Sequence, residues 1–310
     1  FVESNRGRFL LLSAVLPNSE DLALWLTKSK ETVYKDNWRP SDERLGILEW
    51  NGEYVNLNWM NNDEGRPSFN NKFVIREQQP LIPRQRKVRF FPSDKNGAVA
   101  STTYKLRSFG PALIFVGLKD SVFPMASAYL KCLGNDPDDF KWTNNFDWKA
   151  FELASIEAYG KNNNWLIFAK KGILCHHGAL HSDVRLPVER LMRNDKPLVI
   201  ISTSTLGQGV NLGVSSVVFS TIYQGKDLIT ARDFWNIAGR AGRAFVDHEG
   251  KILVAMDTSD TATFRARQKI KWYEETIRNY FNKEKIDVAS SGILALVKAL
   301  ISRVTSEGGI

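Results

Sequence analysis

The sequence is poor in the residues that mark secreted and membrane-spanning proteins. It has only two cysteines, Cys132 and Cys175, and they lie far apart. Two such cysteines argue against a disulfide scaffold and fit a reducing compartment, so we expect a cytoplasmic protein, or a nuclear or nucleoid one. No apolar run reaches the length of a membrane-spanning helix, and we therefore expect no membrane partner.

Patterns for metal and triphosphate binding are also scarce. His176 and His177 are adjacent, but no cysteines or carboxylates accompany them at ligand spacing, so we expect no metal site. Cys175 has no defined base to make it a nucleophile. The chain contains neither a G-x-x-x-x-G-K-[ST] loop nor a strand ending in Asp-Glu, the features that bind triphosphate and Mg²⁺.

The composition is that of an ordinary globular protein with an excess of positive charge. The 310 residues are 43% hydrophobic and 25% charged, which is enough for one large or two medium domains. The net charge of +8 suits a polyanionic partner such as nucleic acid, although many basic proteins bind none.

From residue 111 onward, apolar strand patterns alternate with helical ones. The expected strands are PALIFVG, GILCHHGA, PLVIIST, VSSVVFST and GKILVAMD. The expected helices are KDSVFPMASAYLKCL, FDWKAFELASIEAYG, SDVRLPVERLMRND (capped by Ser182 or Asp183) and ITARDFWNIAGRAGR up to its glycines. This order predicts an α/β fold, a parallel sheet with helices on both faces.

The regions before residue 111 and after about residue 260 have other sequence patterns. Residues 9–16 predict a buried strand, followed by a helix capped by Asn18 or Ser19. Within 31–110, strands are expected in TVYKDNW, LGILEW, EYVNLNW and KVRFFP, and turns or loops in MNNDEGRPSFNNK and PSDKNG. Aromatic residues there could stack on bases or form a small β core. The tail from about 260 is expected to be helical, and GILALVKALISRV carries an apolar stripe that needs a partner surface.

Two segments have the chemistry of phosphate binding. STSTLGQGVNL (202–212) follows a β-branched strand, and its hydroxyls and exposed amides could hold a phosphate or simply form a turn. FWNIAGRAGRA (234–244) places Arg240 and Arg243 three residues apart, on one face if the segment is helical. Arginine presents its donors in a planar fork that suits phosphate oxygens, although a solvated helix end is the alternative.

Together and in this order, the two segments resemble motifs V and VI of superfamily 2 helicases. LLSAVLPNSEDLALWL resembles motif III, with Val15 where the family usually has Thr, and ALIFVGLKDSV resembles motif IV. NWRPSDERLGILEW and GILCHHGALHSDVRLPVE resemble further signatures, the first of them typical of the Ski-like DExH group. The resemblance spans residues 9–50 and 111–257, and it implies the second RecA-like lobe of such a helicase.

The resemblance implies four parts. They are a remnant of the first RecA-like lobe (1–30), a linker with a strand-rich insertion (31–110), the second RecA-like lobe (111–258) and the start of a helical C-terminal region (259–310). The triphosphate-binding loop precedes motif III in the family, so we expect most of the first lobe to be missing. That lobe, the expected partner, would hold most of the ATP and Mg²⁺, and this chain alone is expected not to hydrolyse ATP.

The resemblance also implies roles for single residues. Arg240 and Arg243 hold the positions of arginine fingers for ATP. The expected nucleotide-binding residues are Gly207, Gln208, Gly209, Asn211, Asn236 and Gly239, with Asn236 where the family often has Gln. The expected nucleic-acid contacts are Thr203, Ser204, Thr205, His177, Gly178 and Lys119. Ser13 and Ala14 would couple hydrolysis to strand movement.

The resulting expectation is one lobe of an ATP-dependent helicase that acts on DNA or RNA. A double-strand translocase with the same motor is one alternative. A non-enzymatic nucleic-acid-binding or scaffold module is another. A small-molecule α/β enzyme has less support, because no acid/base constellation is visible. The sequence does not indicate the oligomeric state.

Overall fold

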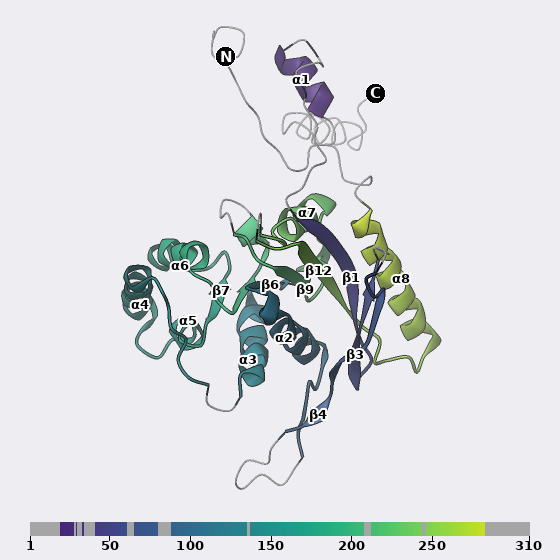
Figure 1. The fold of residues 1–310 in the computed structure, drawn as a ribbon, viewed down its shortest axis with the longest axis horizontal. Coiled ribbons are helices and arrows are strands. Elements are labelled where there is room, and N and C mark those ends of the chain that lie inside the picture. Colours follow the sequence, from purple (N-terminus) through teal and green to yellow (C-terminus); the bar gives the residue numbers. More distant parts are fainter. Residues whose placement is uncertain are drawn as a thin grey trace, which may run out of the picture. The chain divides into compact units, whose positions relative to one another are not determined.

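The computed structural model describes residues 19–27, 29, 33, 41–60, 65–79, 88–134, 137–207, 212–243 and 246–282. The chain divides into two units, of which one comprises Phe1–Trp38 with Lys283–Ile310 and the other Arg39–Asn282. The first unit contains helix α1 (Ser19–Thr27), and all other elements belong to the second (Figure 1). Several expectations lie outside the described residues: the strand at 9–16, Ser13, Ala14, the segment TVYKDNW except for one residue, and the apolar stripe at 293–304.

The second unit is built on an eight-stranded sheet with the spatial order β3-β2-β1-β12-β9-β6-β8-β7. From β1 to β7 in this order all neighbours are parallel, whereas β2 and β3 are antiparallel. The strands are β1 (Asp42–Trp50), β2 (Tyr54–Trp59), β3 (Phe69–Ile75), β6 (Ala112–Phe115), β7 (Ile173–His176), β8 (Val199–Ser202), β9 (Ser216–Phe219) and β12 (Glu249–Asp257). Two small pairs are β4 (Glu77–Gln78) with β5 (Phe90–Phe91) and β10 (Tyr223–Gln224) with β11 (Asp227–Leu228).

The central strands are short, apolar and buried on both faces. Every residue of β6, β7, β8 and β9 is buried, as is most of β12. Parallel strands need cover on both faces, and continuous runs such as Val199–Ser202 satisfy this because neither face carries an exposed residue. The predicted α/β fold with a mostly parallel sheet is therefore confirmed.

The helices of this unit begin at side-chain caps. Asp94, Asn144, Asn163, Thr230 and Thr263 each accept a hydrogen bond from a backbone N–H in the first turn of the helix that follows. The helices are α2 (Lys95–Leu106), α3 (Val122–Cys132), α4 (Asn145–Tyr159), α5 (Asn164–Ala169), α6 (Ser182–Asn194), α7 (Ala231–Ala238) and α8 (Phe264–Phe281), and the 3₁₀ turns are η1 (Arg107–Phe109), η2 (Lys119–Ser121) and η3 (Ser204–Gly207).

The expected cap of α6 was wrong. His181, not Ser182 or Asp183, occupies the cap position, and its Nδ1 accepts from the N–H of Asp183 at 3.4 Å. Ser182 is already the first helical residue.

Aromatic side chains attach α7 to the sheet and to α8. The ring of Phe234 stacks on Phe219 of β9 with centroids 4.5 Å apart, and it also stacks on Tyr280 of α8. The indole N–H of Trp235 donates to the carbonyl of Tyr280 at 3.0 Å. These contacts hold the end of α7, and the arginines that follow it, at a fixed place beside the sheet.

The region 41–110 differs from the insertion that the sequence suggested. Strands β1, β2 and β3 extend the same sheet as the strands after residue 111, so the expected division at 110 is not visible in the sheet. Residues 69–75 form β3, not a loop, and residues 95–106 form α2, which packs against β12, β9 and β6 (Figure 1).

Strand β1 enters the sheet beside the turn that follows α7. The N–H of Asp42 donates to the carbonyl of His248 at 3.0 Å, and Asp42 pairs with Glu249. Gly242 has a φ of 86°, and a Cβ there would collide with Ser41 Oγ. Glycine is required at this point, because the left-handed backbone and the close approach both exclude a side chain.

Candidate functional site

The residues expected to carry function lie at the two ends of the parallel strands. Lys119 follows β6, His177 follows β7 and Thr203 follows β8, so all three are at carboxyl ends of strands. Arg240 and Arg243 follow α7 and lie beside the segments that enter β6, β9 and β12. We call the first group, Lys119, His176, His177, Gly178, Thr203 and Thr205, the carboxyl-edge cluster. We call the second group, Gly239, Arg240, Ala241, Gly242 and Arg243, the arginine turn.

A chain of hydrogen bonds fixes the hydroxyls of the carboxyl-edge cluster. Thr203 Oγ1 lies 3.2 Å from Thr205 Oγ1, which lies 3.5 Å from His176 Nδ1. On its other side, His176 Nε2 lies 3.2 Å from Glu189 Oε1 on α6. The backbone N–H of Thr203 donates to the carbonyl of His176 at 3.3 Å. A buried histidine and a carboxylate therefore position two threonines on the loop after β8.

The protonation state of His176 decides which way these hydroxyls point. Burial lowers the pKa of His176, and the hydrogen bond that its ring makes to Glu189 opposes the shift only in part. The neutral ring has one N–H, and the negative Glu189 favours placing it on Nε2. Nδ1 then accepts from the Thr205 hydroxyl, whose oxygen in turn accepts from the hydroxyl of Thr203.

His177 is placed differently from the contact residue that the sequence suggested. Its side chain is buried, its ring packs against Trp165 with centroids 5.0 Å apart, and its Nδ1 accepts from the N–H of Ala179 at 3.2 Å. Burial, followed by the charges of His176 and Lys119, lowers the pKa of His177. The ring therefore shapes the turn after β7 from inside.

Gly178 is exposed and lies against the loop after β8. A Cβ there would lie 3.2 Å from Thr205 Cγ2. Arg185 Nη2 holds the turn from α6, because it donates to the carbonyls of Gly178 at 3.2 Å and Leu180 at 3.3 Å. Glycine thus leaves room for the Thr205 side chain, whereas a Cβ would press on its methyl group.

Lys119 adds a positive charge to the same edge. It begins η2, is exposed, and lies near enough to His177 to lower the pKa of that ring. The structure therefore brings Lys119, Gly178, Thr203 and Thr205 to one surface. Ser204 lies between the two threonines in the sequence and begins η3.

The arginine turn is not helical, which agrees with the prediction of a helix that ends at its glycines, so the two arginines do not share a helix face. Helix α7 ends at Ala238, Gly239 caps it, and Ala241 forms a parallel bridge with Val214. The positive φ of Gly242 then redirects the chain. The two arginines flank a short extended segment, because a glycine precedes each of them and ends the helical geometry.

Arg243 is held by a carboxylate four residues later. Its Nε lies 3.0 Å from Asp247 Oδ2, and its Nη2 lies 2.8 Å from Asp247 Oδ1. Nη2 also donates to the carbonyl of Phe109 at 3.2 Å, and the backbone N–H of Arg243 donates to Asp247. The hydrogen bond to Asp247 raises the pKa of Arg243, and the arginine lowers the pKa of Asp247 despite its burial.

Arg240 lies at the other end of the turn and is half-buried. Burial lowers the pKa of its guanidinium, as expected where water is partly excluded. Its backbone N–H donates to Ile237, and its carbonyl accepts from Val214 at 3.1 Å. Asn236 and Gly239, which precede it, are both exposed.

One chain segment joins the two groups. Residues 203–214 run from the end of β8 to the residue that pairs with Ala241, and η3 within them lies against α7. Gly207 ends η3. Three residues of this segment with expected nucleotide contacts lie outside the described residues: Gln208, Gly209 and Asn211.

The sequence reasoning missed Asp247. The signal was present, because Arg243 and Asp247 are four residues apart, a spacing at which opposite charges often pair. The carbonyl of Phe109 could not have been found, since it comes from 134 residues earlier in the chain.

The described residues fit an anion better than a metal ion. Arg240 and Arg243 both lie on the arginine turn, and guanidinium groups suit phosphate oxygens. Among the described residues, no three His, Cys, Asp or Glu side chains gather as a metal ion would require. Within the same part, no helix combines the length and the apolar character needed to span a bilayer.

Comparisons with known proteins identify helicases among the relatives of this chain. Residues 150–245 match the family model described as the helicase conserved C-terminal domain. The chain is 39% identical over 310 residues to the Hachiman protein HamB of Bacillus cereus, covering 96% of this chain and 26% of that protein. It is 25% identical to the exosome RNA helicase MTR4 of Mus musculus, covering 88% of this chain and 28% of that protein. It is also 25% identical to the ATP-dependent DNA helicase Hel308 of Caldivirga maquilingensis, covering 87% and 32%. The chain thus spans about a quarter to a third of these relatives.

Proposed function

Because this chain carries the C-terminal RecA-like lobe of a superfamily 2 helicase, we propose that it is one half of an ATP-driven nucleic-acid motor. The other half would be a first RecA-like lobe that holds most of the ATP and the Mg²⁺. The observation that supports the proposal is the placement of cationic and hydroxyl side chains at both ends of one sheet, with Lys119 and two threonines at one end and the two arginines at the other.

On the nucleotide side, Arg243 would be the arginine finger. Asp247 and the carbonyl of Phe109 occupy its Nε and Nη2, and among the described residues Nη1 makes no hydrogen bond. The guanidinium is therefore oriented before any ligand arrives, with one donor nitrogen left for a phosphate oxygen. Arg240 would add a second charge. Bound ATP would supply the phosphoryl group whose developing negative charge these side chains stabilise.

On the nucleic-acid side, the carboxyl-edge cluster would contact the sugar-phosphate backbone. The hydroxyls of Thr203 and Thr205 and the charge of Lys119 suit phosphate oxygens and read no base. Binding through such contacts would weaken as salt rises and would depend little on sequence. The relatives named above include an RNA helicase and a DNA helicase, and the proposed phosphate contacts suit a strand of either kind.

Coupling between the two sides would run through residues 203–214. A shift of the threonines on nucleic-acid binding would move η3 against α7, whose end carries the arginine turn. Closure of the two lobes would in turn pull on the same segment. This contiguous connection is the physical basis for nucleic-acid-stimulated ATP hydrolysis in our proposal.

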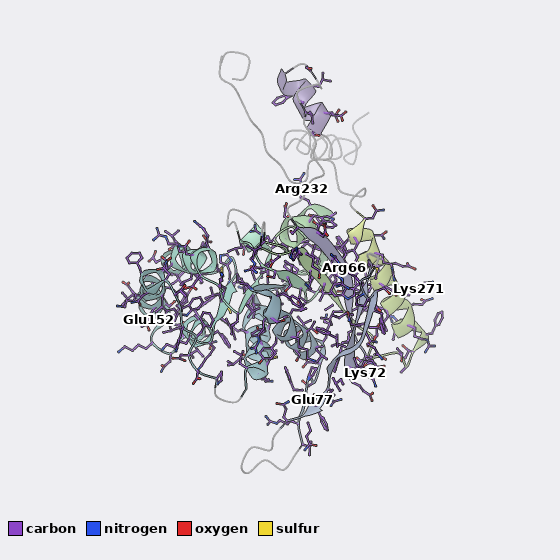
Figure 2. The ribbon with its side chains drawn as sticks, viewed as in Figure 1. Arg66, Lys72, Glu77, Glu152, Arg232 and Lys271 are labelled. Atoms are coloured by element: carbon purple, nitrogen blue, oxygen red, sulfur yellow. The ribbon has the colours of Figure 1, made fainter. Side chains whose placement is uncertain are left out.

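The test is ATP hydrolysis by the intact protein with the variant Arg243→Ala. We expect nucleic-acid-stimulated turnover to fall by about 10³-fold or more, the usual cost of removing an arginine finger. Arg232→Ala is the matched control, because Arg232 lies on α7 and is exposed (Figure 2), and its turnover should stay within about twofold. Turnover in Arg243→Ala equal to that of the control would refute the role of Arg243.

A second measurement tests the missing-lobe argument. The chain of 310 residues alone should hydrolyse no ATP. Turnover by this chain that nucleic acid stimulates and that Arg243→Ala abolishes would contradict the proposal that a first lobe is needed. ATP hydrolysis without strand displacement by the intact protein would favour the translocase alternative.

A further inference from the structure

A cavity of about 330 Å³ opens at the carboxyl ends of β9 and β12, beyond the carboxyl-edge cluster. Its walls come from the loops after these two strands, the first turn of α2 and the first half of α8. Because β9 is the neighbour of β6, the cavity lies on the same edge of the sheet as that cluster but two strands further along. Ligands of open α/β sheets bind outside the carboxyl ends of strands.

Two lysines face this cavity without a partner of opposite charge in contact. Lys95 and Lys269 both line it, and neither makes a hydrogen bond or ion pair with any residue in the described ranges. Lys95 also lies at the first position of α2, where the helix dipole disfavours a cation. Burial, assisted by the charge of Lys269 and opposed by that of Asp257, lowers the pKa of Lys95. A bound anion would relieve this unfavourable arrangement.

The two carboxylates in the cavity wall are held by their own loop. Asp257 Oδ1 accepts from the N–H of Ser259 at 3.0 Å and from its hydroxyl at 2.6 Å. Asp260 Oδ1 accepts from the N–H of Ala262 at 3.2 Å. In each carboxylate one oxygen is committed to the loop. The second oxygen, Oδ2, is left to accept from an N–H donor on a ligand.

Two tyrosine rings complete the wall. Tyr223 and Tyr273 lie with ring centroids 6.3 Å apart and planes inclined by 25°, and both are half-buried. The hydroxyl of Tyr273 accepts from the N–H of Ile222 at 3.2 Å, which fixes its ring. Aromatic side chains held in this way offer a face on which a planar base can stack.

We propose that this cavity binds one nucleotide, with its phosphate at Lys95 and Lys269 and its base against Tyr223 and Tyr273. The amino group of the base would then lie within reach of Asp257 or Asp260. A nucleotide combines an anion, a planar ring and N–H donors, the three features that these wall residues suit. The nucleotide could belong to a strand that continues past the carboxyl-edge cluster, or it could be free in solution. The proposal goes beyond the motor function and does not rest on it.

The test uses the intact protein with two probes, AMP and a single-stranded oligoadenylate. The variant Lys95→Gln/Lys269→Gln should weaken AMP binding at least tenfold. Lys271→Gln is the matched control, because Lys271 lies on the same helix, is 79% exposed and pairs with Glu275 (Figure 2), and it should change the affinity less than twofold. A parallel loss of oligonucleotide affinity would assign the site to the strand, and a loss for AMP alone would assign it to a free nucleotide.

A second variant separates a binding defect from a folding defect. Tyr223→Ala should weaken binding of AMP but leave binding of ribose 5-phosphate unchanged. In our proposal the base contacts the Tyr223 ring, and ribose 5-phosphate has no base. Unchanged AMP affinity in the double lysine variant, with Tm measured for both proteins, would overturn the proposal. ATP hydrolysis is measured on the same samples. Normal ATP hydrolysis by a protein that does not bind AMP would refute this cavity as a site and would leave the motor proposal unaffected.

Discussion

The pair formed by Arg243 and Asp247 gives the sharpest test of the arginine turn. Asp247 accepts four hydrogen bonds: three from Arg243 at 2.8, 3.0 and 2.8 Å, and one from Ser215 at 3.3 Å. The side chains are only 19% and 10% exposed. Asp247→Asn keeps the shape and removes the charge, so we expect a loss of unfolding free energy of about 3 kcal/mol near pH 7. For a unit of this size that loss corresponds to a Tm lower by about 6–12 °C.

The pH dependence provides the second half of this test. The pKa of Asp247 is below its ordinary value of 3.8, so its contribution is fully present above pH 3.8 and is lost as pH falls through the lowered pKa. The difference between wild type and Asp247→Asn should therefore shrink below pH 3.8. Asp227→Asn, at an exposed position of β11, is the control and should leave Tm unchanged. Equal Tm values for wild type and Asp247→Asn at pH 7 would refute the reasoning.

Two further predictions concern stability. Gly242→Ala should lower the unfolding free energy by about 3 kcal/mol or more in urea titrations, because a positive φ and a collision with Ser41 add together, whereas Gly225→Ala, at a positive φ with open space around it, should cost only about 1 kcal/mol. Burial lowers the pKa values of His176 and His177 below 6.5. Their contribution to the unfolding free energy is therefore fully present above pH 6.5 and is lost as the pH falls below it. A Tm that stays flat between pH 7.5 and pH 5 would contradict this, and His176→Gln/His177→Gln should flatten the curve.

The sequence predicts the central sheet well because its strands carry a strong local signal. PLVIIST and GKILVAMD are continuous apolar runs, and β8 and β12 coincide with them. The same reasoning missed β3, since Phe69–Ile75 contains two asparagines and a lysine that are typical of loops. It also missed α2, whose glycine, threonines and valine have low helix propensity and are helical here because they pack tightly on the sheet.

Prediction from the sequence has the same limit at the candidate site, because local signals do not reveal contacts between distant segments. Motif order brought Thr203, Arg240 and Arg243 into the argument, and the glycines predicted the end of the helix, but only the coordinates reveal that the carbonyl of Phe109 lies against Arg243. The cavity at β9 and β12 has no motif, since its lysines and tyrosines come from α2, α8 and a loop that are distant in sequence. Pairing between distant segments is set by tertiary packing, which periodicity does not encode.

The entry of the chain at β1 has a mechanical consequence. Ser41 lies against Gly242, and the N–H of Asp42 donates a hydrogen bond to the carbonyl of His248. The residues at the start of β1 therefore support the arginine turn. A force on the residues before Ser41 would act on these two contacts before it reached the rest of the sheet. Tension on the residues before Ser41 would therefore change the orientation of the Arg243 guanidinium, while the nine-residue pairing of β1 with β12 remained intact. The start of β1 would in this way transmit a pull on the preceding chain to the arginine turn.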